Sequence, residues 1–164
     1  MFVTVLHQLA DPKNIAMILR SHVAFGGSEI IFSGYDEPYV FSKKYKGISR
    51  SLEKQCSFIH IKEESELFDW FIENNYTSVA VEISDISINL PEYDFNNKTA
   101  LILGTESGGL SSEFISRCDN VVKIPQFGNI GSMNVAISAS IVMYELNRGR
   151  TDIKPVIGQM YDYK

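Results

Sequence analysis

Short apolar runs alternate with longer amphipathic stretches along the whole of this 164-residue chain. Runs of four to six apolar and β-branched residues between polar or glycine-rich turns are typical of buried strands. We predict six strands, at residues 2–6, 29–33, 57–61, 78–83, 99–103 and 121–124. Apolar residues at helical spacing predict helices from residue 12 up to Gly26, and over 65–74, 112–117 and 133–147. This alternation predicts an α/β fold with a mostly parallel six-stranded sheet flanked by helices.

The first and last predicted helices carry further signals. Asp11-Pro12 places an N-capping carboxylate ahead of a proline at the first helical position. In the last helix, apolar side chains recur on one face, at Val135, Ala139, Val142 and Leu146. This stripe fits either core packing or contact with a second copy of the chain.

Length and composition are those of a globular protein with one domain. Apolar residues make up 45% of the chain, and no apolar run approaches the roughly 20 residues of a membrane helix. The first residues have no basic region ahead of the apolar run, so we interpret them as a strand and not as a signal peptide. Cys56 and Cys118 form no spaced motif with each other or with the three histidines. We therefore expect reduced thiols, no metal site and a cytoplasmic location.

A net charge of −5 argues against a broad nucleic-acid surface, because phosphate contacts require Lys and Arg. The cations nevertheless crowd one stretch, at Lys43, Lys44, Lys46, Arg50 and Lys54. Aromatic residues lie in and beside this stretch, at Tyr35, Tyr39, Phe41 and Tyr45. Aromatic side chains among cations can stack on bases and hold phosphates. A solvated loop with its aromatics packed on the sheet is the alternative, and the sequence leaves both open.

The fifth predicted strand ends in a glycine-rich loop at residues 104–110, GTESGGL. The usual nucleotide fingerprints, G-x-G-x-x-G and G-x-x-x-x-G-K, are absent from the sequence. Glycines let backbone approach a ligand closely, and open α/β sheets bind ligands at the carboxyl ends of their strands. A plain turn between strand and helix would also suit glycine, so the loop alone does not decide between a ligand site and a turn.

Three separated motifs together are more specific. The first motif is Asn14 with Arg20-Ser21 and Phe25-Gly26. The second is the glycine loop. The third is Ile124-Pro125 with Ser132-Met133-Asn134 and the helix ending Tyr144-Glu145-Leu146. In this order and at these separations, they resemble the motifs of the SpoU (TrmH-like) RNA ribose 2'-O-methyltransferases of the SPOUT class. The resemblance covers nearly the whole chain.

The resemblance implies a single SpoU-type methyltransferase domain over residues 1–164. It implies a C-terminal trefoil knot, over about residues 77–150, that binds S-adenosylmethionine. The implied reaction methylates the ribose 2'-hydroxyl of RNA, either tRNA or rRNA, without a metal or a membrane. The family also implies a homodimer in which the last helix packs on its mate and the site draws on both chains. The rival hypothesis is a family member that binds S-adenosylmethionine or RNA without turnover.

The resemblance also assigns residues to the site. The implied cofactor-binding residues are Val81, Glu82, Gly104, Ile124, Ser132 and Met133. Backbone groups at these positions would read the adenine edge, while apolar side chains cover the ring. The implied catalytic residues are Arg20, Asn14, Glu106, Ser132 and Asn134.

Arg20 matches the family's central catalytic arginine. A guanidinium keeps its proton and is a poor general base, so we expect it to bind an RNA phosphate bidentately and orient the hydroxyl. We expect Asn134 to orient Arg20 or the ribose, and Glu106 to hydrogen-bond substrate or hold a neighbouring loop. Each residue also has a purely structural alternative: a surface arginine, a solvated acid at Glu106, a first-turn polar residue at Asn14 and an N-cap at Ser132.

Overall fold

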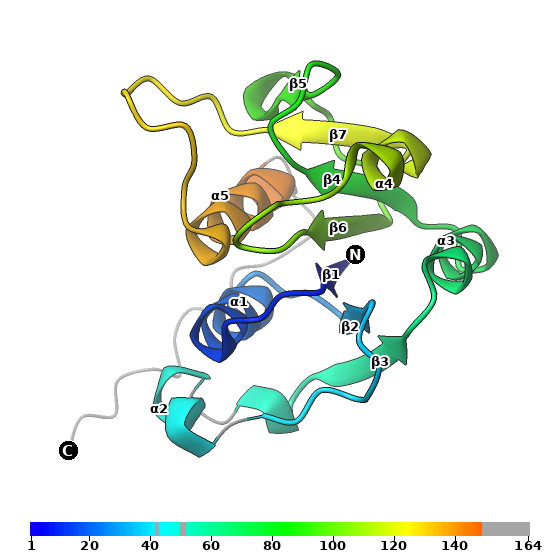
Figure 1. The fold of residues 1–164 in the computed structure, drawn as a ribbon, viewed down its shortest axis with the longest axis vertical. Helices are drawn as coiled ribbons and strands as arrows, with labels where there is room; N and C mark the ends of the chain where they lie inside the picture. Colours follow the sequence, from blue (N-terminus) through cyan, green and yellow to red (C-terminus); the bar gives the residue numbers. More distant parts are fainter. Residues whose placement is uncertain (42, 50–51, 149–164) are drawn as a thin grey trace.

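The computed structural model describes residues 1–41, 43–49 and 52–148. Within them the chain forms a parallel seven-stranded sheet in the order β3-β2-β1-β6-β4-β7-β5 (Figure 1). The strands are β1 (Phe2–His7), β2 (Glu29–Ser33), β3 (Ser57–Ile61), β4 (Thr77–Val81), β5 (Ile88–Asn89), β6 (Thr99–Leu103) and β7 (Asn120–Lys123). The α/β class with a parallel sheet is as predicted.

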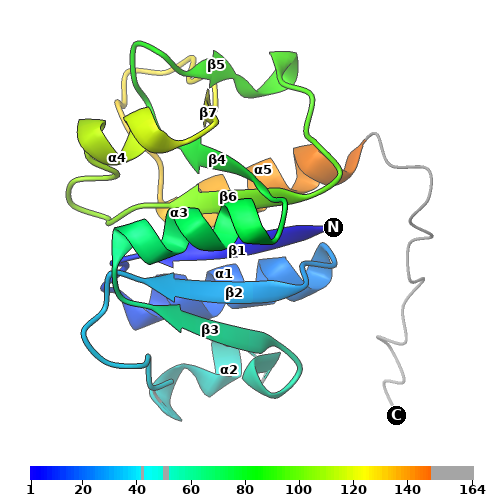
Figure 2. The same cartoon turned by 90° about the vertical axis from the view of Figure 1, so that its right-hand side faces the viewer.

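Helices cover both faces of this sheet (Figure 2). α1 (Pro12–Ala24) and α5 (Val135–Arg148) pack against each other on one face. α3 (Glu64–Glu73) and α4 (Ser112–Arg117) lie on the opposite face. The remaining turns are a short helix, α2 (Lys46–Ser49), and three 3₁₀ turns, η1 (Lys43–Tyr45), η2 (Leu52–Lys54) and η3 (Leu90–Glu92).

The central strand β1 shows why the helices form two layers. Phe2 and Leu6 belong to the core that the sheet shares with α1 and α5. Val3 and Val5 point the other way and belong to the core shared with α3 and α4. All four side chains are fully buried. A strand that is buried on both faces has no polar alternation, and β1 accordingly carries apolar residues on both sides of the sheet around the buried Thr4.

The prediction of six strands was wrong, because the sheet has a seventh. The additional strand β5 lies between the predicted strands at residues 78–83 and 99–103, where the sequence predicted no strand. It is two residues long and pairs with β7 at the edge of the sheet, with Ile88 opposite Val122. Two residues followed closely by Pro91 cannot display the period-two pattern by which a strand is recognised.

The winding of the chain reverses in the middle of the sheet. β1 leads to β2 on one side, whereas its neighbour β6 leads towards β7 on the other. Open α/β sheets bind ligands in the crevice outside the carboxyl ends of the strands at such a switch point. The fold therefore places a candidate site where β1, β4, β6 and β7 end.

The segment between β2 and β3 packs its aromatic side chains onto the sheet. Tyr39 stacks on Phe32 with 4.6 Å between ring centroids, and Phe41 meets the same ring edge-on at 5.9 Å. The Tyr35 hydroxyl donates a hydrogen bond to the Leu9 carbonyl at 2.6 Å. Of the two interpretations of this segment, packing on the sheet is confirmed for these three aromatic residues.

Some predictions fall wholly or partly outside the described residues. Arg50 of the basic stretch and residues 149–150 at the end of the implied knot are among them, and the trefoil knot itself stays a prediction. None of the described helices has the length and apolarity needed to cross a membrane. The described residues also bring together no group of three or more His, Cys, Asp or Glu side chains that could hold a metal ion.

Candidate cofactor-binding and active site

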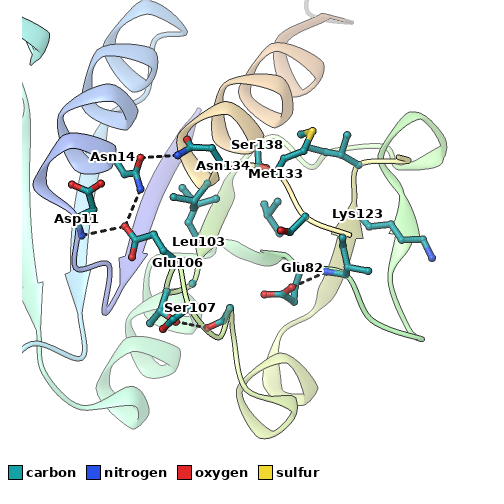
Figure 3. Close-up of a pocket in the computed structure, with 18 of the residues that line it drawn as sticks. Asp11, Asn14, Glu82, Leu103, Glu106, Ser107, Lys123, Met133, Asn134 and Ser138 are labelled. Carbon is teal, nitrogen blue, oxygen red and sulfur yellow. Dashed lines mark hydrogen bonds between the residues drawn. The ribbon is translucent and has the colours of Figure 1, made fainter. Parts of the chain in front are cut away.

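A cavity of about 980 Å³ lies at the carboxyl ends of β1, β4, β6 and β7 (Figure 3). The turn after β1, the loop after β4, the glycine loop after β6 and the segment from β7 to α5 line it. Nine of the ten predicted site residues are among the lining: Asn14, Val81, Glu82, Gly104, Glu106, Ile124, Ser132, Met133 and Asn134. The fold thus brings residues from all three sequence motifs to one place.

The glycine loop folds back on itself as a tight hairpin. The Thr105 N–H donates to the Gly109 carbonyl at 3.2 Å, and the Gly109 N–H donates to the Thr105 carbonyl at 2.9 Å. A Cβ added at Gly104 would lie 2.6 Å from the Gly109 carbonyl oxygen, so a side chain does not fit there. Gly109 itself has a φ of +64°, in the left-handed region that favours glycine. The hairpin therefore requires both glycines, and Gly104 lines the cavity with backbone alone.

Glu82 joins the loop after β4 to this hairpin. Its carboxylate accepts hydrogen bonds from the N–H groups of Ile83 and Leu110, both at 2.9 Å. A side chain at Gly109 would collide with the same carboxylate, so the contact is close. The Glu82 side chain therefore holds two walls of the cavity together, and its backbone is the part left for a ligand.

Hydrogen bonds join Glu106, Asn14 and Asn134 into an amide relay along the cavity wall (Figure 3). Glu106 Oε1 accepts from Asn14 Nδ2 at 3.1 Å, and Asn14 Oδ1 accepts from Asn134 Nδ2 at 2.9 Å. Asn134 Oδ1 then accepts from the Ala136 N–H at 2.9 Å. An ionised carboxylate can only accept, so each amide must turn its NH₂ towards the preceding group. The relay therefore holds both amides in one orientation.

The backbone holds Glu106 as well. Its Oε2 accepts from the Ala10 N–H at 3.2 Å, and its Oε1 accepts from the Asp11 N–H at 3.1 Å. Burial alone would raise the pKa of Glu106, but the hydrogen bonds from Asn14 and from backbone N–H groups outweigh it and hold that pKa below its ordinary value of 4.5. Glu106 is therefore an ionised anchor that ties the glycine loop to the start of α1, which is one of the roles the sequence predicted.

The last helix begins later than predicted, at Val135. Asn134 caps it, since its side-chain oxygen accepts from the N–H groups of Ala136 at 2.9 Å and Ile137 at 3.3 Å. The interpretation of Ser132 as the N-cap was wrong, because Ser132 lies two residues ahead of the cap. Ser132 is instead exposed and lines the cavity.

The apolar stripe of α5 belongs to the core. Ala139, Val142 and Leu146 are buried among core residues of the sheet and α1, and Val135 is half-buried at the cavity. Core packing is therefore the confirmed interpretation of the stripe.

The lining of the cavity suits a ligand with an apolar ring and polar edges. Its larger apolar side chains come from the last three of the four lining segments and include Val81, Leu103, Ile124, Met133 and Val135, while the first segment adds Ala10. Small-molecule sites are typically apolar with a few convergent polar groups, which the amide relay supplies here. Among the described lining residues, Lys123 is the only Lys or Arg.

Arg20 is the one predicted site residue that does not line the cavity. It follows Asn14 by six residues on α1, and six residues turn about 600° around a helix, so the two side chains leave different sides. Asn14 is buried, whereas Arg20 is exposed. The expectation that Asn134 orients Arg20 is not met within one chain, because its NH₂ donates to Asn14. A single chain thus assembles the cavity with Arg20 outside it.

Several lining residues were not predicted: Gln8, Ala10, Asp11, Lys123, Gln126 and Ser138 are among them. Gln8 directly follows β1 with a left-handed φ of 54°, and Lys123 is the last residue of β7. Their position at the carboxyl ends of strands was the signal that could have identified these two.

The sequence matches the model of the SpoU rRNA Methylase family over residues 1–144. The chain belongs to this family. This SpoU-family chain is 29% identical over 147 residues to a tRNA (guanosine(18)-2'-O)-methyltransferase from Borreliella burgdorferi, covering 87% of the chain and 64% of the relative. It is 27% identical over 146 residues to the 23S rRNA (guanosine-2'-O-)-methyltransferase RlmB from Coxiella burnetii, covering 89% of the chain and 58% of the relative. The chain therefore spans about three fifths of the length of these relatives.

The SpoU fold is also evident from solved structures. The SpoU methyltransferase AviRb from Streptomyces viridochromogenes, in complex with the cofactor AdoMet, matches with a TM-score of 0.81 and 25% identity. The match covers 93% of this chain and 58% of AviRb. The parallel α/β fold is therefore that of a SpoU methyltransferase domain.

Proposed function

We propose that this chain is an S-adenosylmethionine-dependent methyltransferase that acts on the ribose 2'-hydroxyl of tRNA or rRNA. The observation that carries the proposal is the convergence of residues from all three motifs on one cavity. Membership of the SpoU family supports it. The names of the two relatives, 2'-O-methyltransferases of guanosine in tRNA and in 23S rRNA, agree with the same reaction.

The residues of the cavity fit S-adenosylmethionine. Gly104 presents backbone to the cavity, because any side chain there would overlap the hairpin. Val81, Ile124 and Met133 offer apolar side chains to an adenine ring. When bound, S-adenosylmethionine supplies an electrophilic methyl group attached to a positively charged sulfur.

The chain's own residues align the ribose 2'-hydroxyl, which accepts the methyl group, and bind the charged phosphate beside it. An in-line displacement at a methyl group depends chiefly on holding both reactants in the right geometry. The amide relay keeps the polar wall of the cavity rigid, and Ser132 and Asn134 contact the ribose. The guanidinium of Arg20 binds the phosphate beside the target nucleotide, which orients the 2'-hydroxyl. The proposal requires no metal.

A homodimer is part of the proposal, because one chain does not bring Arg20 to its own cavity. A second copy would supply this arginine. A face of α5 offers apolar surface to such a copy, with exposed fractions of 50% at Ile137, 37% at Ile141 and 58% at Tyr144. α5 packs beside α1, which carries Arg20 (Figure 1).

The remaining predictions enter the proposal unchanged. Residues 1–164 act as one methyltransferase domain, and the segment of about 77–150 forms the cofactor-binding knot. The protein acts on its RNA in the cytoplasm, without a membrane partner. A family member that binds S-adenosylmethionine or RNA without turnover is the outcome that would replace this proposal.

The test is transfer of labelled methyl from S-adenosylmethionine to unmodified bulk tRNA and bulk rRNA. We expect label in one of the RNA pools and an equal amount of S-adenosylhomocysteine. Calorimetric titration of the protein with S-adenosylmethionine, run in parallel, reports cofactor binding separately. Binding without transfer to either RNA pool would contradict the enzyme and favour the non-catalytic module.

A further inference from the structure

The positive charge of this acidic chain is concentrated in two stretches, residues 12–24 and 43–54. Together they contain seven of the fifteen Lys and Arg residues but only one of the twenty Asp and Glu residues. The first stretch is α1, and the second contains η1, α2 and η2. The structure packs these three elements against α1 (Figure 1). Two separate parts of the sequence thus form one basic face, with exposed side chains at Lys13, Arg20, Lys43, Lys44 and Lys54.

The aromatic residues that precede and flank the lysines anchor this face to the sheet. Tyr39 is stacked on Phe32 and the Tyr35 hydroxyl is bonded to the Leu9 carbonyl, so their rings are turned towards the protein. Because these two rings are occupied, the segment is poorly arranged to stack on bases. The lysines remain on the outside, where they can interact with a partner through their positive charge.

Four of these five side chains carry a charge that no ion pair offsets. Within the described residues, Lys13, Arg20, Lys43 and Lys54 form no ion pair, whereas elsewhere Lys62 pairs with Asp36, Arg117 with Glu64 and Arg148 with Glu145. Four unpaired cations on a chain of net charge −5 are suited to a polyanion, which they attract by releasing bound counterions.

We propose that the basic face binds the phosphodiester backbone of the RNA substrate. It begins at the rim of the candidate site, because Lys13 lies on α1 between Asp11 and Asn14, which both line the cavity. From there it continues past Arg20 and over the segment at Lys43 to Lys54. Phosphate contacts position an RNA without reading its sequence, so this face guides the strand and leaves base choice to other residues. This inference rests on the proposed RNA methyltransferase function.

The test compares charge reversals of equal size on and off the face. Lys43→Glu and Lys54→Glu lie on it, and neither residue belongs to the proposed active site. Lys98→Glu is the matched control, since Lys98 is exposed and directly precedes β6, at the opposite end of the sheet from the cavity. The probe is fluorescently labelled, unmodified bulk tRNA, titrated with the 164-residue chain between about 50 and 200 mM KCl, the range over which phosphate contacts weaken strongly. Calorimetry with S-adenosylmethionine and thermal unfolding verify that each variant is folded.

We expect each reversal on the face to raise the Kd for tRNA by about fivefold to tenfold near 0.1 M salt. We also expect it to reduce the slope of log K against log salt by about one. Lys98→Glu should change neither the Kd for tRNA nor the slope of log K against log salt. Equal effects of all three variants would overturn the basic face, because they would report net charge alone, and so would unchanged tRNA binding in Lys43→Glu and Lys54→Glu.

Failure of the basic face and failure of the proposed function are distinguishable. If wild-type protein transfers methyl groups while the face variants bind tRNA like wild type, the basic face is wrong and the enzyme stands. If wild-type protein transfers no methyl group but the face variants lose tRNA affinity, the basic face stands and the proposed enzyme does not.

Discussion

Gly104 and Glu106 lie two positions apart in one loop and are constrained for different reasons. Gly104 must lack a side chain, because the backbone of the hairpin occupies the space. Glu106 must be an acceptor at both oxygens, because three N–H groups converge on them. The motif identified both residues from the sequence, whereas only the structure shows that one shapes the cavity and the other holds its wall.

We expect Gly104→Ala to weaken S-adenosylmethionine binding at least tenfold. The added Cβ must displace the hairpin, and overpacking of this kind costs about 1–3 kcal/mol of stability. Gly108→Ala is the matched control in the same loop, because its nearest neighbour would be Thr105 Oγ1 at 3.6 Å, an ordinary contact. Calorimetric titration measures the affinity and thermal unfolding measures the stability. Equal cofactor affinity in both variants would show that Gly104 does not shape the site.

The charge of Glu106 predicts that the thermal stability of the protein depends on pH. The pKa of Glu106 in the folded protein is below its ordinary value of 4.5, so the ionised carboxylate stabilises the fold above that pH. This contribution is lost as the pH falls through the lowered pKa. We therefore expect the Tm of wild type to exceed that of Glu106→Gln near neutral pH and the difference to shrink below pH 4.5. A difference that stays constant across this range would mean that the charge does not matter to the loop.

Among the elements, the start of α5 combines a helix cap with a wall of the cavity. Asn134 serves both through one amide group: its oxygen caps the helix and its NH₂ continues the relay to Asn14. Substitutions that retain one of the two roles can therefore separate the helix cap from the relay.

We expect Asn134→Asp to keep the cap of α5, because a carboxylate caps a helix as well as an amide does. The same variant loses the NH₂ donor and leaves the buried Asn14 oxygen unpaired, which costs about 1–3 kcal/mol of stability. Because Asn14 is then no longer held in one orientation, methyl transfer should also fall tenfold or more. Asn134→Ala should lose about 1 kcal/mol of stability in addition, and Ser132→Ala should lose none. Unfolding curves and transfer rates measure the two effects. A fully active Asn134→Asp would remove the relay from the mechanism.

Elements were predictable where burial leaves a pattern in the sequence. β2 and β6 have the predicted bounds, because each is a run of buried residues between polar turns. β3 also has its predicted bounds, although only its last residue, Ile61, is buried. β5 was not predictable, because its two residues are recognisable as a strand only through their pairing with β7. The start of α5 was ambiguous for a similar reason: Ser132 and Asn134 are both good capping residues, and only the observed hydrogen bonds distinguish them.

At the scale of the whole molecule, the sheet order explains how residues about 120 positions apart meet. Asn14 and Asn134 are hydrogen-bonded because α1 and α5 pack side by side on one face. The alternation of strands and helices predicted the layers, but it did not predict that α1 and α5 pack beside each other. The position of Arg20 outside its own cavity was equally hidden, because sequence spacing does not show which copy of the chain a side chain serves.

A mixed-dimer experiment tests whether Arg20 serves the partner's cavity. Arg20→Ala protein should bind S-adenosylmethionine normally yet transfer no methyl group, and Gly104→Ala protein should be inactive at cofactor concentrations below its weakened affinity. Dimers formed from one chain of each kind should regain activity, because one of their two sites combines an intact cavity with an intact arginine. Purified heterodimers carrying different affinity tags provide the measurement. Heterodimers as inactive as both parents would show that each chain uses its own Arg20.

The central claim is that the methyl group is placed on a ribose, and mass spectrometry of the product RNA tests it most directly. The RNA is methylated with deuterated S-adenosylmethionine, digested to nucleosides and fragmented across the glycosidic bond. We predict that the added mass stays with the sugar fragment, in wild-type protein and not in Arg20→Ala. Added mass on the base fragment, or equal labelling by the Arg20→Ala variant, would contradict the account.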